Sequence, residues 1–252
     1  MLALTRGISS AIGRCQLTHQ AREPIDLLLA RTQHDEYERA LQSLGCDVRR
    51  LDSDETMPDS VFIEDTAVVL PEIAVIARPG AESRRLEVDA VAAALEPLRR
   101  LVHIGAPGTL DGGDVLVIGR TVFVGRSTRT SDSGIEQLRA AVAPFGYAVE
   151  PVSTSGCLHL KSAVTCVDAR TVLINPLWVS REPFQTFRQI DVDPGEPGAA
   201  NLVSIGQGVI AAAAYPRTRT RLEEHGVHVT CVDASELAKA EGALTCCSLL
   251  VS

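Results

Sequence analysis

The chain has 252 residues, of which 45% are hydrophobic, enough to bury a full core as one large domain or two small ones. Its 32 acidic and 24 basic residues give a net charge of -8, which argues against a surface for nucleic acid or an anionic membrane. Its seven cysteines are scattered and odd in number, and no stretch is apolar enough to cross a membrane, so we expect no disulfide framework and a cytoplasmic location.

The predicted elements follow one repeated order along the chain: a polar or reactive head, two short strands, a helix and a third strand. The first unit has strands at 62–70, 73–77 and 101–104 and a helix near 83–96. The second has strands at 114–118, 121–124 and 147–152 and a helix near 133–144.

The third unit opens with a hairpin over 158–177 that turns near 168–170, has a weak helix, and closes with a strand near 187–192. The fourth has strands at 201–205, 209–213 and 227–232 and a helix over 217–225. The remaining segment, 244–251, is predicted to be a strand that pairs with the amino-terminal strand and so completes a fifth unit.

The heads of the five units recur at intervals of roughly 42 to 48 residues, which is typical of propeller-like repeats. We therefore predict an α/β fold: a five-bladed α/β propeller of ββαβ repeats around a pseudo-five-fold axis, with residues 1–252 in one domain. A doubly wound sheet is the rival, but paired short strands for each helix fit it poorly. The five heads, expected to converge on the axis, are Glu64, Asp111, His159, Asn201 and Cys246.

A cysteine, a histidine and an aspartate among these heads are the parts of a cysteine hydrolase. Taken singly, each has a commoner reading: Cys246 as a small core residue, His159 as a satisfied polar group on a half-buried strand, and Asp111 as a turn former. Adjacent residues of a strand point to opposite faces, so Cys246 is expected to face the axis while Cys247 packs in the core. No cysteine or histidine pair has the spacing of a structural zinc site, and we predict no metal.

Several carboxylates accompany the cysteine. Glu64 and Asp65 follow Phe62, and Asp59 precedes it. Surface carboxylates are common, but carboxylates that converge with a thiol suit a cationic ligand, above all a planar guanidinium, which they bind in bidentate fashion.

Five segments together make the chain resemble the dimethylarginine dimethylaminohydrolases, guanidine-modifying enzymes of the pentein superfamily, which also includes arginine deiminase and glycine amidinotransferase. The resemblance covers nearly the whole chain. Its marks are Met57-Pro-Asp-Ser-Val-Phe-Ile-Glu-Asp-Thr-Ala-Val-Val, Arg78-Pro-Gly-Ala-Glu-Ser-Arg-Arg-Leu-Glu-Val, Thr109-Leu-Asp-Gly-Gly-Asp-Val-Leu, Leu158-His-Leu-Lys-Ser and Leu244-Thr-Cys-Cys-Ser.

The resemblance implies a role for each matched residue. Cys246 would be the nucleophile, His159 the general acid and base, and Asp111 its carboxylate partner. The implied substrate contacts are Glu64 and Asp65 as a guanidinium clamp, Phe62 as a stacking aromatic, Arg84 and Arg129 on the α-carboxylate, and Asp59 and Leu4 at the amino-acid end or pocket wall. The stretch from Thr5 to His19 resembles the family's mobile lid.

The implied reaction is hydrolysis of Nω-methylated arginines to citrulline and dimethylamine or methylamine through a covalent cysteine thiouronium, without a cofactor. The partner is then a small-molecule substrate, and self-association into a homo-oligomer stays open. An arginine deiminase or another amidine hydrolase is the alternative within the class, although the helical insertion expected of arginine deiminases is absent between the repeats. A non-catalytic, ribosome-binding propeller is the alternative from another class, because a fold alone does not secure catalysis.

Overall fold

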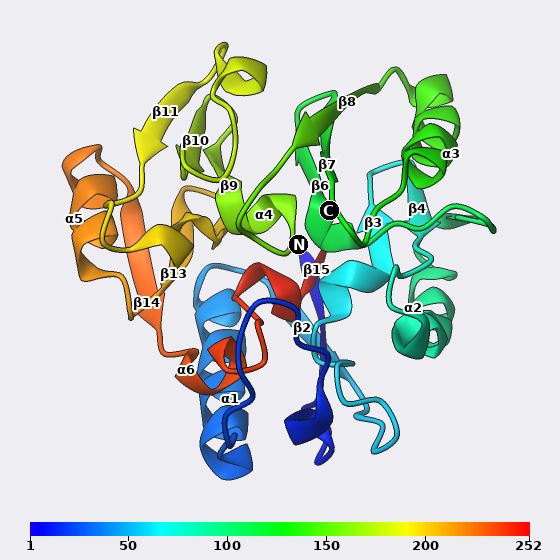
Figure 1. The fold of residues 1–252 in the computed structure, drawn as a ribbon, viewed down its shortest axis with the longest axis horizontal. Helices are drawn as coiled ribbons and strands as arrows, with labels where there is room; N and C mark the ends of the chain where they lie inside the picture. The colour runs from blue at the N-terminus through cyan, green and yellow to red at the C-terminus, as the bar shows by residue number, and fades with distance from the viewer.

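The computed structural model describes residues 1–252 and confirms the predicted fold, a five-bladed α/β propeller (Figure 1). Five three-stranded sheets surround one axis, and in each the inner strand pairs antiparallel with the middle strand, which pairs parallel with the outer one. From inner to outer strand, the blades are β3 (Ala67–Val69), β4 (Ile73–Ile76) and β5 (Arg100–His103); β6 (Val115–Ile118), β7 (Thr121–Arg126) and β8 (Ala148–Ser153); β9 (Val164–Asp168), β10 (Thr171–Ile174) and β11 (Arg188–Asp191); β12 (Leu202–Ile205), β13 (Gly208–Ala212) and β14 (His228–Val232); and β15 (Leu249–Val251), β1 (Leu2–Arg6) and β2 (Asp47–Leu51).

The connection from each middle strand to its outer strand is the helical part of the repeat, and a parallel pair requires such a crossover. The predicted helices near 83–96, 133–144 and 217–225 are all present, the first beginning as a 3₁₀ segment, and the weak helix of the third unit is one 3₁₀ turn. In blade order the connecting helices are η3 (Glu82–Glu87) with α2 (Val88–Leu95), α3 (Asp132–Val142) with η5 (Ala143–Phe145), η6 (Glu182–Phe184), α5 (Pro216–Glu224), and α1 (Leu27–Ser43).

The heads of the units differ from the prediction, because all five lie at short helical turns rather than at strand starts. No neighbouring strand is available there, so the backbone is satisfied locally by N–H bonds to the carbonyl three residues earlier, such as Asp114 N to Asp111 O and Cys247 N to Leu244 O. The strands therefore begin later than predicted, and 244–248 is not part of the terminal strand. The five turns are η2 (Ile63–Thr66), η4 (Gly112–Asp114), α4 (Leu160–Ala163), η7 (Pro197–Ala200) and η8 (Thr245–Cys247).

The core is divided into five hydrophobic clusters, one between each pair of neighbouring blades. Successive side chains of an inner strand point to opposite faces, so each inner strand serves two clusters. In β12, for example, Leu202 packs toward the third blade and Val203 toward the fifth. Every blade is thus held on both sides, which gives the heads at the axis a rigid frame.

The two ends of the chain close the ring, as predicted. β15 pairs antiparallel with β1 in the register Leu2 to Val251 and Leu4 to Leu249, and both termini lie near the axis (Figure 1). The remaining short helices are η1 (Ile12–Arg14), in the loop after β1, and α6 (Ser235–Ala238), before η8. None of the helices combines the length and the apolar character needed to cross a membrane.

Candidate active site

The turns at the axis surround a small pocket that contains the predicted nucleophile and base. The segments that line it come from the loop after β1, from η2, η3 and η8, and from the loops before α3, α4 and η8. Seven of the ten predicted site residues line this pocket: Asp59, Phe62, Asp65, Arg84, Arg129, His159 and Cys246.

His159 lies between two buried carboxylates. It is the extended residue that precedes α4, rather than a strand residue as predicted, and Leu160 anchors the turn in the core. Its Nε2 is 3.1 Å from Asp111 Oδ2, and its Nδ1 is 3.8 Å from Asp65 Oδ1. The predicted partnership between His159 and Asp111 is therefore present as a hydrogen bond.

The charge around His159 decides its protonation. Burial by itself lowers the pKa of an imidazole, but Asp65, the hydrogen bond with Asp111, and Asp114 outweigh it and raise the pKa of His159 to about 9. The ring is thus an imidazolium at neutral pH, and its Nε2–H donates to Asp111. An imidazolium on the wall of the pocket that also contains Cys246 is suited to act as an acid.

Asp65 is held in its ionised form. Burial by itself raises the pKa of Asp65, but the positive charges of His159 and Arg84 outweigh this effect and lower the pKa to about 2. Arg84 Nη1 donates to Asp65 Oδ2 over 2.6 Å, and the backbone N–H of Gly113 donates to Asp65 Oδ1 over 2.9 Å. The pocket therefore keeps a fixed negative charge beside the imidazolium.

Cys246 lies half-buried in η8, on the wall of this pocket. Burial, with the negative charges of Glu64 and Asp65, raises the pKa of the Cys246 thiol to about 12, so the free enzyme holds a neutral thiol. Cys247 is buried in the core, as predicted. The reason differs from the prediction, because the two cysteines diverge on a 3₁₀ turn and not across a strand.

Phe62 and Asp59 line the same pocket. The Phe62 ring packs so closely on the backbone of Gly242 that a Cβ there would lie 2.1 Å from Phe62 Cε1. The Asp59 carboxylate accepts the backbone N–H of Gln16 at 3.0 Å and 3.2 Å, so it holds the loop that follows β1. Burial raises the pKa of Asp59 despite the nearby Arg84.

The two predicted carboxylate-binding arginines differ in how free they are. Arg84 is buried, pairs with Asp65 and Glu87, and donates to the carbonyl oxygen of Phe62. Arg129 is half-buried, forms no ion pair, and donates only to Thr18 Oγ1 at 3.1 Å. Arg129 thus has guanidinium N–H groups that are not hydrogen-bonded within the protein, whereas Arg84 holds the loop that carries Asp59 and Asp65.

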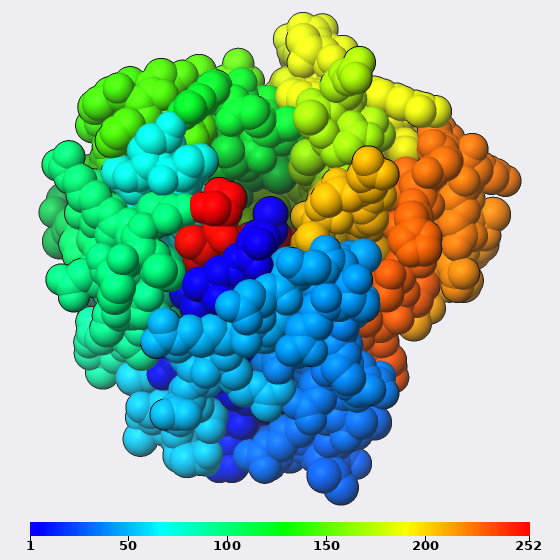
Figure 2. Space-filling view, turned by 180° about the vertical axis from the view of Figure 1, so that it is seen from behind, coloured from blue at the N-terminus to red at the C-terminus, as the bar shows by residue number.

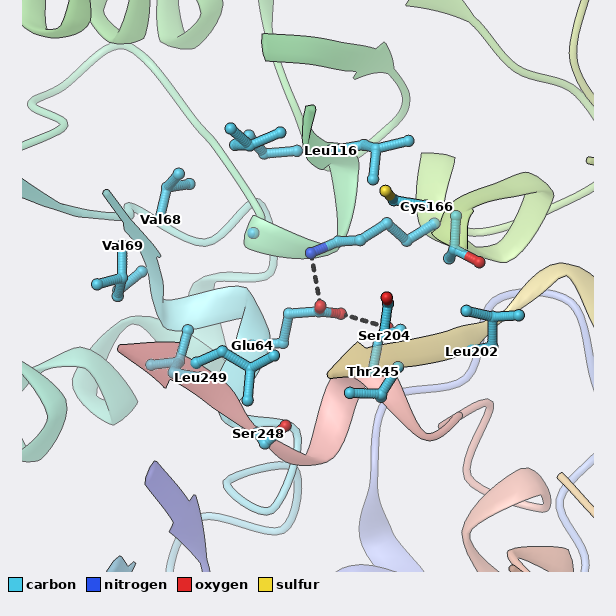
Figure 3. A pocket seen from close by; sticks show the side chains of 18 residues that line it. Glu64, Val68, Val69, Leu116, Cys166, Leu202, Ser204, Thr245, Ser248 and Leu249 are labelled. Carbon is cyan, nitrogen blue, oxygen red and sulfur yellow. Dashed lines mark hydrogen bonds and ion pairs between the residues drawn. The ribbon is translucent and has the colours of Figure 1, made fainter. Parts of the chain in front are cut away.

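Glu64 lies apart from these residues, in a larger cavity on the propeller axis. Its carboxylate accepts hydrogen bonds from Thr245 Oγ1 at 2.7 Å and from Lys161 Nζ at 2.5 Å, and Figure 3 draws these two contacts of Glu64 as dashed lines. Burial raises the pKa of Glu64. Its predicted contact with a guanidinium stays a prediction, although its charge already acts on the Cys246 thiol.

This axial cavity is the larger of the two, yet it lacks the nucleophile and the base. Its walls are mainly apolar side chains of the inner strands, such as Val68, Leu116 and Leu249. Figure 2 shows the opposite face of the propeller, which is hollowed at its centre beside the two chain ends. The predicted nucleophile and base therefore lie in the smaller pocket.

Leu4 is the one predicted site residue that lies neither on a wall of these two cavities nor in contact with a residue of the pocket's predicted catalytic group. It lies in the middle of β1, paired with Leu249, and is completely buried in the cluster between the fifth and first blades. An apolar residue in the strand that closes the ring faces an interblade core and not the axis. Thr5 and Arg6 are likewise buried in β1, so only 7–19 of the predicted lid segment is loop.

Comparison with known proteins decides the family. A family model described as eukaryotic N,N dimethylarginine dimethylhydrolase matches residues 10–181. The N(G),N(G)-dimethylarginine dimethylaminohydrolase of Streptomyces coelicolor is 42% identical over 249 residues, which cover 98% of this chain and 95% of that one. The chain belongs to the dimethylarginine dimethylaminohydrolase family.

Two solved structures agree with this assignment. A cysteine-to-serine mutant of the Pseudomonas aeruginosa dimethylarginine dimethylaminohydrolase, complexed with citrulline, superimposes with a TM-score of 0.94 at 34% identity and covers 98% of this chain and 97% of its own. A dimethylarginine dimethylaminohydrolase with a histidine replaced by glycine, in an adduct with S-methyl-L-thiocitrulline, also has a TM-score of 0.94 and 34% identity, with 98% of both chains covered.

Asp114 was assigned no role at the site from the sequence and was placed only at the start of a predicted strand. Its buried carboxylate accepts the N–H of Leu160 at 3.0 Å and the hydroxyls of Ser127 at 2.5 Å and Thr130 at 2.7 Å. Asp114 therefore ties the η4 turn to α4 and to the loop before α3. The available signal was the second aspartate of Asp-Gly-Gly-Asp, spaced to lie on the same turn as Asp111.

One group of side chains in this pocket could hold a cation. Ligand atoms of Asp65, Asp111 and His159 lie within 4.8 Å of one another. Arg84 and backbone N–H groups, however, already donate hydrogen bonds to the two carboxylates. The arrangement suits a cationic organic group better than a metal ion.

Proposed function

We propose that this protein hydrolyses Nω-methylated arginines to citrulline and dimethylamine or methylamine, with Cys246 as nucleophile, His159 as general acid and base, and Asp111 as the carboxylate that orients His159. The observation that carries the proposal is the placement of Cys246 and the hydrogen-bonded His159 on one small pocket with the carboxylate of Asp65. Membership of the dimethylarginine dimethylaminohydrolase family supports the choice of substrate.

The first step is activation of the thiol. With a pKa of about 12, Cys246 is thiolate in only about one molecule in 10⁵ at pH 7. A guanidinium bound beside the sulfur favours the charged thiolate and lowers the pKa of Cys246, because an opposite charge at short range stabilises the ionised form. Binding of the cationic substrate thus favours transfer of the thiol proton to a water molecule, which carries it into the solvent, and generates the nucleophilic thiolate.

The second step forms the covalent intermediate. The Cys246 thiolate adds to the guanidinium carbon, and a new S–C bond forms. The His159 imidazolium gives its proton to the departing nitrogen, the C–N bond breaks, and dimethylamine or methylamine leaves. The products of this step are a cationic S-alkylthiouronium on Cys246 and a neutral His159.

The third step regenerates the enzyme. Neutral His159 accepts a proton from a water molecule, which adds its oxygen to the thiouronium carbon. The C–S bond then breaks, the carbonyl group of citrulline forms, and the proton of the added hydroxyl group passes to the sulfur, so that citrulline and the Cys246 thiol are produced together. Asp111 and Asp65 stabilise the imidazolium that forms again, and Asp111 also holds the ring in orientation.

The rest of the pocket supports the choice of a methylated amino acid. The ring of Phe62 and the side chains of Leu158 and Ala240 provide apolar walls on which an N-methyl group can rest. Arg129 has free donors for the α-carboxylate. We further propose that residues 1–252 form one domain and that the enzyme works in the cytoplasm, since its seven cysteines are all free thiols.

The test measures citrulline release from asymmetric dimethylarginine, monomethylarginine and arginine without added metal. We expect the wild type to act on the methylated substrates and Cys246→Ala to lose at least roughly 10³-fold in kcat. Cys247→Ala is the matched control, because it removes the neighbouring thiol from the core and should keep turnover. Release from arginine alone would indicate an arginine deiminase, and turnover by none of the proteins would favour a non-catalytic propeller.

A further inference from the structure

The loop between β1 and α1 lies over the pocket and is held there by carboxylates. Gln16, in this loop, lines the pocket beside Cys246. Three acidic side chains from elsewhere in the fold accept its backbone N–H groups. Glu55 accepts Ser10 N at 3.1 Å, Asp59 accepts Gln16 N, and Glu241 accepts the end of the loop. The loop is thus fastened at its beginning, its middle and its end.

Glu241 makes the most extensive of these contacts. Its carboxylate accepts three consecutive backbone N–H groups: Thr18 N at 2.9 Å, His19 N at 2.5 Å and Gln20 N at 2.6 Å. Three successive N–H groups that point at one anion form an anion-binding concavity, and hydrogen bonds to a carboxylate are stronger than those between neutral groups. Glu241 therefore accepts most of the hydrogen bonds that fix this end of the loop.

The backbone at Glu241 is strained in a way that favours glycine. Its φ is +57°, and it is the only residue other than glycine with a positive φ. The position follows α6, with Glu241 N bonded to Ala238 O and Gly242 N to Leu237 O, the kind of helix end at which glycine is preferred. A glutamate here costs stability, so its side chain must contribute something that glycine cannot.

The position of Glu241 also connects the loop to the substrate pocket. Glu241 and Gly242 line that pocket, and Gly242 is packed against the Phe62 ring with no room for a side chain. The carboxylate thus joins the rim of the pocket, at Glu241, to the loop that covers it. Release of the loop would widen the pocket between Gln16 and Glu241.

We propose that Glu241 is the positioning residue that keeps the loop of residues 7–20 closed over the Cys246 pocket and so retains the bound substrate. The inference rests on the proposed function for its substrate, but the contact itself does not depend on turnover. The closed loop places Gln16 on the wall of the pocket, where it can contact the bound substrate. Opening of the loop therefore weakens binding of the substrate and of the transition state to a similar extent.

Two variants test the role. Glu241→Gln keeps the shape and removes the charge, and Glu241→Gly removes the side chain and relieves the positive φ. Glu182→Gln is the control, since Glu182 is exposed and its side chain makes no hydrogen bond or ion pair. Amide hydrogen exchange of Thr18 to Gln20 reports loop opening in the free enzyme, and steady-state kinetics on monomethylarginine report retention.

For Glu241→Gly we expect exchange at Thr18 to Gln20 to quicken at least roughly 5-fold, and KM to rise by a similar factor while kcat changes by less than about 2-fold. Glu241→Gln should lie between this variant and the wild type. The thermal midpoint of Glu241→Gly should equal or exceed that of the wild type, because glycine accepts the left-handed conformation. Glu182→Gln should change none of these values.

Unchanged exchange at Thr18 to Gln20 in Glu241→Gly would overturn the proposal, and so would faster exchange with an unchanged KM. A lower thermal midpoint with unchanged exchange would make Glu241 a purely structural residue, which also overturns it. Hydrogen exchange needs no turnover, so a wild type that releases no citrulline would contradict the proposed function without affecting this measurement.

Discussion

His159 carries a proton that an exposed imidazole would lose near neutral pH, and this proton couples the proposed general acid and base to the stability of the fold. The folded-state pKa of His159 is about 9, raised above its ordinary value of 6.5 by Asp65, Asp111 and Asp114 against the effect of burial. A group whose pKa rises on folding stabilises the protein fully below its unfolded pKa. The contribution is lost as the pH rises through the folded pKa.

We therefore expect the unfolding free energy to fall by about 3 kcal/mol between pH 6 and pH 9.5 through this residue alone, from a shift of 2.5 units at about 1.36 kcal/mol per unit. Urea unfolding across this range measures it. His103→Gln, which alters an exposed histidine of β5, should keep the full dependence, whereas His159→Gln should flatten it. An equally steep fall in His159→Gln would assign the effect to other groups.

Asp111 sets the direction of the proton on His159. Asn in its place offers an amide that can donate as well as accept, so the ring loses the partner that fixes the orientation of Nε2–H. We expect Asp111→Asn to lower kcat by at least roughly 10²-fold in the citrulline assay with an unchanged circular dichroism spectrum. Asp35→Asn, at an exposed carboxylate paired with Arg50, is the control. A kcat within about 3-fold of the wild type would refute the role.

At the scale of elements, the short turns at the axis depend on close packing around glycine. Gly113 in η4 lies beneath the imidazole, and a Cβ there would be 2.6 Å from His159 Nδ1 and 2.8 Å from Asp65 Oδ1. The turn can approach this closely only because the residue has no side chain. The orientation of His159 is therefore set in part by a residue without functional groups.

Gly113→Ala should displace the imidazole and lower kcat by roughly 10²-fold in the citrulline assay, because a shift of even 1 Å in a catalytic group is costly. Gly119→Ala is the matched control. Gly119 lies in the β6–β7 turn with φ +61° and open space around its Cβ position, so it should lose about 1 kcal/mol of stability and keep its activity. Equal activity of the two variants would contradict this account.

The strands and connecting helices were predictable from the sequence, whereas these short turns were not. Hydrophobic alternation located the strands and the connecting helices of the first, second and fourth units, because those segments repeat a regular pattern. The turns at the heads carry no such pattern. Their conformation depends on long-range partners, such as Asp114 with Leu160 N or Asn201 Nδ2 with Thr245 Oγ1, which periodicity does not reveal.

At the scale of the whole molecule, the ring was predictable because five similar units can bury their faces only by packing on one another. The convergence of Cys246, His159 and Asp111 near the axis was predictable from the ring, since each of them heads one of the units. The contacts that hold the loops and turns around the pocket were less predictable. Asp114 and Glu241 act through backbone N–H groups far away in the sequence, and neither contact has a local signature.

Ring closure also explains the misplaced Leu4. β1 is the middle strand of the fifth blade, joined to β15 and β2, so its apolar residues belong to the interblade cores. The side chain of Leu4 is 0% exposed and packs with Ile63 and Leu249. The residue therefore serves the junction at which the two ends of the chain complete the ring.

Leu4→Ala should accordingly act on stability and leave the substrate pocket unchanged. Loss of the side chain leaves a cavity at the closing blade, and we expect a decrease of about 2–5 kcal/mol in the free energy of unfolding by urea. KM for monomethylarginine should stay within about 2-fold of the wild type, because Leu4 does not line the pocket. Leu177→Ala, at a leucine that is 74% exposed, should change neither value. A large rise in KM without a loss of stability would contradict this assignment and would indicate that Leu4 contributes to substrate binding and not to the packing of the closing blade.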